Sequence, residues 1–135
     1  MTPKEYLSQA YKLDRRIGIT LRKAQKLRSA LEYTSPVPEG LGGHGSGDRM
    51  ADSLVRVMEY EEQAQRLREL YIAKYIEIER AIHSVEDTVL REVLERRYLL
   101  YQKWEDIAED MHYSQRTVFY LHGKALQRIA LNCSI

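Results

Sequence analysis

Four side chains near the carboxyl end of the chain have the chemistry that contacts base edges in the major groove of DNA. They are Gln115, Arg116, Phe119 and Tyr120, and their spacing places them along one side of a helix. Arginine can bind guanine through two hydrogen bonds, glutamine can bind adenine in the same way, and an aromatic ring can contact the thymine methyl group. The pattern therefore predicts base contacts. For the two aromatic residues the alternative is packing against the long helices of the chain.

Other polar side chains around the same helix suit contacts with DNA phosphates, namely Lys103, Ser114, Thr117 and Lys124. Phosphate contacts fix the position of a protein on the duplex without selecting a sequence. The whole chain has a formal net charge of only +1, but residues 111–135 contain no Asp or Glu. An acid-free basic segment favours nucleic acid. The alternative is that these cations complement the dipole of their own helix.

Apolar spacing on either side of His112 predicts a helix-turn-helix. One short helix is marked by Trp104, Ile107, Ala108 and Met111, and the final helix by Val118, Leu121, Ala125 and Ile129. Ala108 supplies a small residue where the two helices touch. Ser114 is the predicted amino cap of the final helix. His112 occupies the turn position where glycine is usual, so we expect it in a left-handed conformation, which histidine tolerates better than most residues.

Two long helices are predicted to precede this motif. Apolar residues recur every three or four positions before and after a segment rich in proline and glycine, residues 34–48, which we predict to be a loop. A narrow apolar stripe on a long helix needs a partner helix. Residues 1–83 are thus expected to form an antiparallel hairpin used in oligomerisation or partner docking, and pairing of the same stripes in an intertwined dimer is the alternative. Tyr71 and Tyr75 are expected in the hairpin core.

A boundary between the two parts is predicted at Ser84. The sequence Ser84-Val85-Glu86-Asp87 has the form of a capping box, in which Ser84 would cap a new helix. Val89, Leu90, Val93, Leu94, Tyr98 and Tyr101 give that helix its apolar face. The predicted fold is therefore all-α, with the hairpin followed by a three-helix helix-turn-helix domain at residues 84–135.

The carboxyl-terminal part resembles the promoter-binding fourth domain of bacterial sigma factors. The matching segments are Leu94 to Tyr98, Trp104 to Glu109, Ser114, Thr117-Val118 and Lys124 to Leu126, within residues 86–130. With the long hairpin added, the chain is similar to the ArpU/RinA-type phage regulators. The resemblance implies a phage or prophage origin and control of late-gene transcription, and it leaves direct contact with RNA polymerase open.

Several classes of function are disfavoured by the sequence. The four histidines show no metal-ligand spacing, and no nucleophile lies beside an identifiable base, so we expect no catalytic residues, no metal and no cofactor. No segment is apolar enough to span a membrane, and residues 1–7 lack the apolar run of a secretory signal. The single cysteine, Cys133, cannot form an internal disulfide, which favours a reducing cytoplasm. The resemblance to phage regulators implies that this is the cytoplasm of a bacterial host.

The sequence thus predicts a dimeric transcription regulator that binds double-stranded DNA. Two alternatives belong to other classes. One is a helical protein-interaction adaptor in which the helix-turn-helix is only a scaffold. The other is a subunit of DNA packaging similar to a small terminase, although in those proteins the DNA-binding part usually precedes the oligomerisation part.

Overall fold

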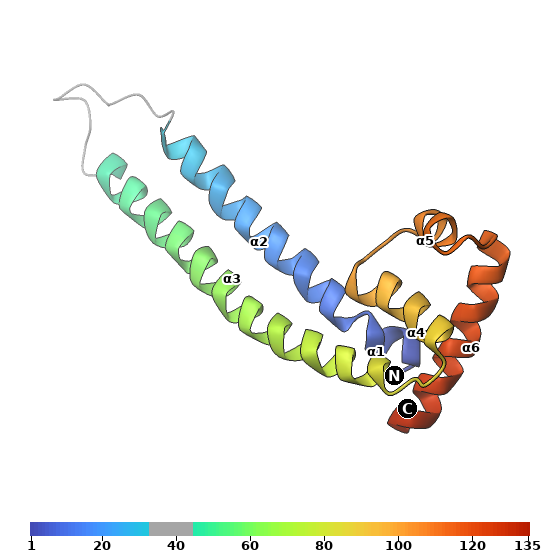
Figure 1. The fold of residues 1–135 in the computed structure, drawn as a ribbon. Helices are drawn as coiled ribbons and strands as arrows, with labels where there is room; N and C mark the ends of the chain where they lie inside the picture. Colours follow the sequence, from blue (N-terminus) through green and yellow to red (C-terminus); the bar gives the residue numbers. More distant parts are fainter. Residues whose placement is uncertain (33–44) are drawn as a thin grey trace. The chain divides into compact units, whose positions relative to one another are not determined.

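A computed structural model describes residues 1–32 and 45–135, and within these ranges all the regular secondary structure is helical, without a strand. The predicted all-α class is therefore confirmed (Figure 1). The helices are α1 (Pro3–Leu7), α2 (Gln9–Glu32), α3 (Gly45–His83), α4 (Thr88–Leu94), the π-helix η1 (Glu95–Leu99), α5 (Trp104–Met111) and α6 (Gln115–Cys133). None of the helices in the described ranges combines the length and apolarity needed to cross a bilayer.

The helices α2 and α3 form the predicted hairpin, running side by side in opposite directions within residues 14–70 (Figure 1). Their buried side chains are small or β-branched: Ile17, Thr20 and Ala24 on α2, and Val57 and Ala64 on α3. Thr20 donates its hydroxyl to the backbone carbonyl of Arg16, so its burial leaves no polar atom unsatisfied. An exposed ion pair also joins the two helices, with Arg28 Nη2 2.6 Å from Glu61 Oε1.

Two details of the hairpin differ from the prediction. Most of the predicted loop 34–48 lies outside the described residues, but α3 already begins at Gly45, so residues 45–48 are helical and the prediction is wrong there. The carboxylate of Asp48 lies in the first turn, where it stabilises the positive end of the helix dipole. In addition, the apolar repeat predicted after the loop includes Met50 and Leu54, yet these two side chains are 44% and 43% exposed.

Residues 1–13 and 71–135 form a second compact unit, which contains the helix-turn-helix. Its larger core cluster joins Leu7 and Ala10 near the amino terminus to Ile82 of α3, Leu94 of α4 and Ile129 of α6. The compact unit thus begins well before residue 84. The predicted core residues Tyr71 and Tyr75 are partly buried here; the Tyr71 and Tyr101 hydroxyls are 2.9 Å apart, and Tyr75 donates to the Leu99 carbonyl.

The predicted capping box at Ser84 is wrong. The cap of α4 is Asp87, whose Oδ1 accepts from the amides of Val89 and Leu90 at 2.9 and 3.1 Å. Ser84 instead ends α3, donating its hydroxyl to the carbonyl of Ala81. The connection between α3 and α4 is three residues longer than predicted because Asp87 supplies both capping bonds by itself.

Candidate nucleic-acid interface

The helix α5, a short turn and the helix α6 form the predicted helix-turn-helix. His112 ends α5 with φ 61° and ψ 39°, the left-handed conformation that was predicted. The amide of Tyr113 donates to the carbonyl of Ala108 at 3.0 Å, so this carbonyl near the carboxyl end of α5 has a hydrogen-bond partner. Ser114 then caps α6, its Oγ accepting from the amide of Thr117 at 3.1 Å. Both local predictions are confirmed.

A small apolar core fixes the two helices of the motif. Val93 of α4, Ile107 and Ala108 of α5 and Val118 of α6 form one buried cluster, and Leu121 packs against it partly buried. Ala108 lies where a small side chain was expected, and Val118 is fully buried, as expected for the residue that holds α6 down. The packing leaves the opposite side of α6 without cover from this unit.

That uncovered side carries the predicted base-contacting residues. Gln115 and Arg116 are exposed in the first turn of α6. Phe119 is 49% exposed, with one edge against the ring of Trp104 at a centroid distance of 5.3 Å, so it packs on α5 and keeps half its surface open. Tyr120 is 60% exposed. The four side chains therefore share one accessible face, and their role in binding bases stays a prediction.

The predicted phosphate contacts border this face. Lys103 is exposed immediately before α5, and Lys124 is exposed on α6 with its Nζ 4.8 Å from the centre of the Tyr120 ring. The hydroxyl of Ser114 donates to Oγ1 of Thr117 at 2.9 Å, so the proton of the Thr117 hydroxyl is available for another acceptor. Thr117 and Lys124 thus lie on α6, and Ser114 is the cap of that helix. Lys103 is the residue immediately before α5.

A buried polar pair that sequence reasoning missed lies beneath the motif. The hydroxyl of Tyr98 and Nε2 of His122 are 2.7 Å apart, and His122 is only 8% exposed. Burial, reinforced by the charges of Lys4 and Arg97, lowers the pKa of His122 to about 4. Burial also raises the pKa of Tyr98 to about 12. The spacing of His122 from Val118, Ala125 and Ile129 places it on the apolar stripe, a signal that could have identified it.

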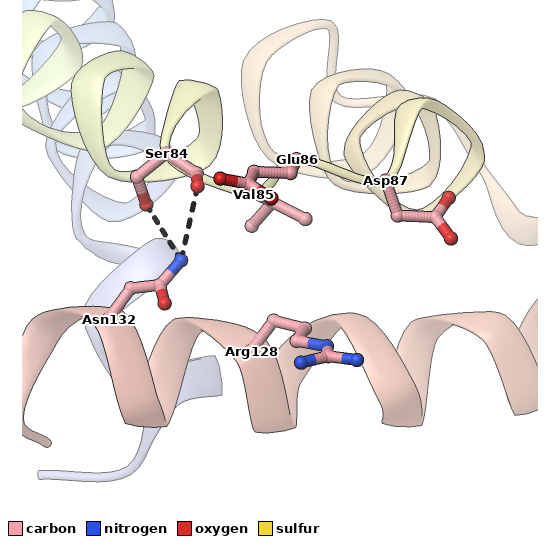
Figure 2. A pocket seen from close by; sticks show the side chains of 6 residues that line it. All are labelled: Ser84, Val85, Glu86, Asp87, Arg128 and Asn132. Carbon is pink, nitrogen blue, oxygen red and sulfur yellow. Dashed lines mark hydrogen bonds between the residues drawn. The ribbon is translucent and has the colours of Figure 1, made fainter.

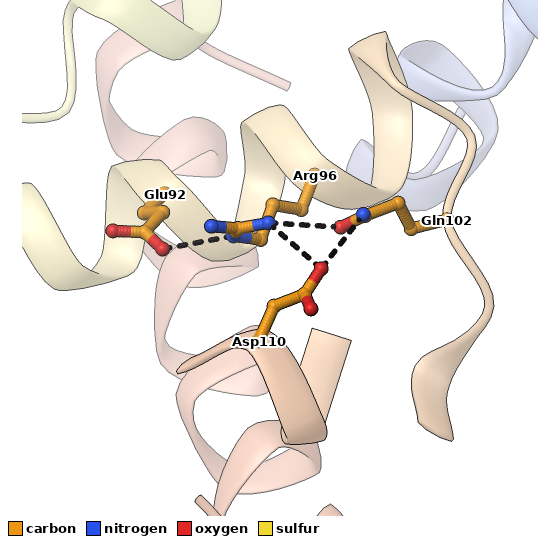
Figure 3. Close-up of polar contacts among 4 residues, drawn as sticks. All are labelled: Glu92, Arg96, Gln102 and Asp110. Atoms are coloured by element: carbon orange, nitrogen blue, oxygen red, sulfur yellow. Dashed lines mark hydrogen bonds and ion pairs between the residues drawn. The ribbon is translucent and has the colours of Figure 1, made fainter. Parts of the chain in front are cut away.

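Charged side chains from three segments hold α5 in position (Figure 3). Arg96 in η1 is 2.8 Å from Glu92 of α4 and 3.2 Å from Asp110 of α5, and Gln102 donates to the same carboxylate at 3.0 Å. Arg97 lies over the Trp104 ring at 4.4 Å and donates to the carbonyl of Gln102. Arg96 thereby neutralises an acidic group on the first helix of the motif.

The carboxyl-terminal half of α6 differs from the half that carries the candidate face. There, a pocket of about 420 Å³ is lined by Ser84, Val85, Glu86 and Asp87 together with Arg128 and Asn132 (Figure 2). The amide of Asn132 donates to the carbonyl and hydroxyl oxygens of Ser84 at 3.2 and 3.1 Å. Because two carboxylates line this pocket, it is a poor surface for phosphate, and the candidate interface ends near Lys124.

Sequence reasoning also missed Gly123, which lies beside Lys124 at the carboxyl end of the exposed face, four residues after Phe119. A Cβ atom built on Gly123 meets nothing within 4 Å, so this unit gives no steric reason for glycine. Glycine inside a helix is destabilising relative to alanine. An isolated glycine lowers the stability of a helix, so its presence in a helical pattern could have drawn attention to this position.

Within the described parts of the chain, no group of three or more histidine, cysteine or acidic side chains could hold a metal ion. Comparisons with protein-family models, with curated proteins and with solved structures found no match to this chain.

Proposed function

We propose that the chain is a sequence-specific regulator that binds double-stranded DNA by placing the first turns of α6 in the major groove. The observation that carries this proposal is the exposed face of α6, which contains no Asp or Glu. The turn before α6 has the geometry of a helix-turn-helix, since His112 is left-handed and Ser114 caps α6. In proteins with this motif, the amino-terminal residues of the second helix contact base edges.

The chemistry of the face supports a division of roles. Gln115 and Arg116 are exposed donors for base edges, and the open surfaces of Phe119 and Tyr120 suit a thymine methyl group. Lys103, Thr117 and Lys124 offer donors to phosphates. The Ser114 hydroxyl is already occupied at the cap, so its contribution is to orient Thr117.

The biological setting follows from the resemblance described above. The similarity to sigma-factor and ArpU/RinA-type sequences supports control of transcription, in a phage or prophage, at late-gene promoters. A single module of this size makes a small interface, so binding by a dimer would be tighter.

Selection of bound sequences from random duplex DNA tests this proposal, together with the salt dependence of binding. We expect an enriched motif and a steep loss of affinity between low and moderate salt, because phosphate contacts release counterions. Absence of enrichment combined with salt-independent behaviour would contradict DNA recognition and favour the adaptor. Ring-sized particles in light scattering would instead favour DNA packaging.

Replacement of Gly123 with alanine tests whether the α6 face approaches DNA closely. We expect Gly123→Ala to raise the free energy of unfolding by roughly 0.5–1 kcal/mol, since alanine is the better helix former. We also expect it to weaken DNA binding, because the added methyl group lies on the face that meets the groove.

Gly18 of α2 provides a matched control, since a Cβ there also meets nothing within 4 Å. Gly18→Ala should stabilise the protein to a similar extent and leave DNA affinity unchanged. Equal DNA affinity of the Gly123→Ala variant and the parent would show that the face does not approach DNA closely at this position. Fluorescence anisotropy and chemical denaturation measure the two quantities.

A further inference from the structure

One side of the helical hairpin carries a groove, here called the hairpin groove, which lies entirely within the unit of residues 14–70. Its volume is about 640 Å³, and its apolar lining consists of Ile19, Leu27 and Ala30 on α2 and Tyr60 on α3. Leu27 and Tyr60 are partly buried, whereas Ile19 is 41% exposed. Apolar groups gain free energy when they leave water, so an occupant of this groove must supply apolar side chains.

Three cations, Arg22, Lys23 and Lys26, complete the lining of the hairpin groove. All three side chains are exposed, and Nζ of Lys23 lies 5.7 Å from the centre of the Tyr60 ring. Among the described residues, no carboxylate forms an ion pair with any of these cations, and none lines the groove. The groove therefore combines apolar side chains with positive charge that the hairpin itself does not neutralise.

A second hollow on α2, of about 300 Å³, shares Arg22 and Lys26 with the hairpin groove. Its other lining residues are Gln25 and Ser29. An amide and a hydroxyl beside two cations can donate hydrogen bonds to a carboxylate. Arg22 and Lys26 thus border both an apolar hollow and a polar one. An occupant that fits both has acidic groups along the edge of its apolar face.

We propose that the hairpin groove binds an acidic amphipathic helix of a partner protein. The groove extends along α2 from Ile19 to Ala30, which is about 17 Å at about 1.5 Å per residue, and three turns of a partner helix have about the same length. Apolar side chains on one face of that helix would fill the groove, as in other helix-in-groove complexes. Its flanking carboxylates would pair with the three cations. Binding at this groove does not depend on DNA binding by α6.

Other anionic partners fit the hairpin groove less well. The phosphates of duplex DNA would pair with the cations but leave Ile19, Leu27 and Tyr60 without apolar contacts. A membrane surface would meet the exposed cations without reaching the partly buried side chains of Leu27 and Tyr60. An acidic helix supplies both the apolar side chains and the opposite charge.

A labelled model peptide tests this binding in fluorescence anisotropy measurements with the full chain. The peptide is about 16 residues long, or roughly four helical turns. It has leucines at alternating spacings of three and four, glutamates on both sides of them and alanines elsewhere. We expect saturable binding that weakens as the salt concentration rises. A peptide of the same composition with the leucines spread around the helix should bind about tenfold more weakly, because it has no apolar face to bury.

Substitutions in the hairpin groove locate the binding site. Lys26→Glu should weaken binding of the acidic peptide about tenfold because like charges would then face each other, and Ile19→Gln should weaken it by removing an apolar contact. Arg66→Glu and Val55→Gln are the matched controls, since both residues are exposed on α3 and lie outside the groove. The controls should change peptide affinity little. All four variants should keep the helix content of the parent by circular dichroism, because each replaced side chain is exposed.

Several results would overturn the proposal. They are an absence of saturable binding of the acidic peptide, equal affinities for the two peptides, and equal effects of Lys26→Glu and Arg66→Glu. The groove would belong to a different occupant if Lys26→Glu, but not Arg66→Glu, abolished dimerisation of the chain or its binding to duplex DNA or to vesicles that contain phosphatidylglycerol. Any of these last results would also contradict the acidic helix.

Discussion

Replacing Arg116 with alanine is expected to weaken binding to the selected DNA sequence by roughly 1–3 kcal/mol, about 5- to 150-fold in dissociation constant. Arg116 is exposed in the first turn of α6, and the acid-free segment around it offers no carboxylate to hold its guanidinium. Loss of a two-bond contact with guanine should also relax the preference at one base pair. Competition binding with site variants measures both effects. The fold should be little affected because the side chain is exposed.

Two further substitutions on α6 separate base recognition from general electrostatics. Lys124→Gln should weaken binding to all sequences alike and reduce the salt dependence, since a phosphate contact carries no sequence information. Arg128→Ala removes the same positive charge from the half of α6 that borders the Ser84–Asp87 pocket, and it should change sequence preference little. Unchanged affinity of Arg116→Ala for the selected site would remove Arg116 from base recognition. A strongly altered base preference of Lys124→Gln would contradict the phosphate assignment.

Acid is expected to destabilise the unit that contains the helix-turn-helix, through His122. The pKa of this imidazole falls from 6.5 to about 4 on folding, chiefly because burial disfavours the charged form. Between about pH 6.5 and pH 4, the imidazole of His122 therefore binds a proton in the unfolded chain and stays neutral in the folded chain. Stability should fall as the pH drops from about 6.5 and level off near pH 4, with a total loss of roughly 3 kcal/mol from this group.

Carboxylates titrate over part of the same range, so the measurement is a difference between two proteins. His122→Gln keeps a neutral partner for the Tyr98 hydroxyl but has no imidazole to protonate. The free energy of unfolding of the parent, minus that of the variant, should decrease between pH 6.5 and 4. A difference that stays constant over this interval would show that His122 does not resist protonation in the fold.

Most of the helix-turn-helix could be predicted from the sequence because its determinants are local. The spacing of Ile107, Ala108 and Val118 fixes which faces are apolar, and Ser114 can cap a helix only at its amino end. The left-handed conformation of His112 follows from the short distance between two helical patterns. Each of these features depends on residues within a few positions of one another.

The position of the α4 cap was less predictable. Ser84 and Asp87 are both good capping residues three positions apart, so the local sequence allows either to begin the helix. The structure selects Asp87, while Ser84 accepts from Asn132, forty-eight residues later in the chain. A contact over that separation contributes to the choice, and no local pattern contains it.

By itself, the sequence determined that the chain forms long amphipathic helices and a helix-turn-helix, because helical periodicity and end signals arise from steric and hydrogen-bonding preferences of neighbouring residues. Only the tertiary structure decided that Leu7 and Ala10 complete the core around α6, that Tyr98 meets His122, and that Leu54 faces outward. These outcomes depend on which helix faces meet, and that depends on packing between segments far apart in the chain.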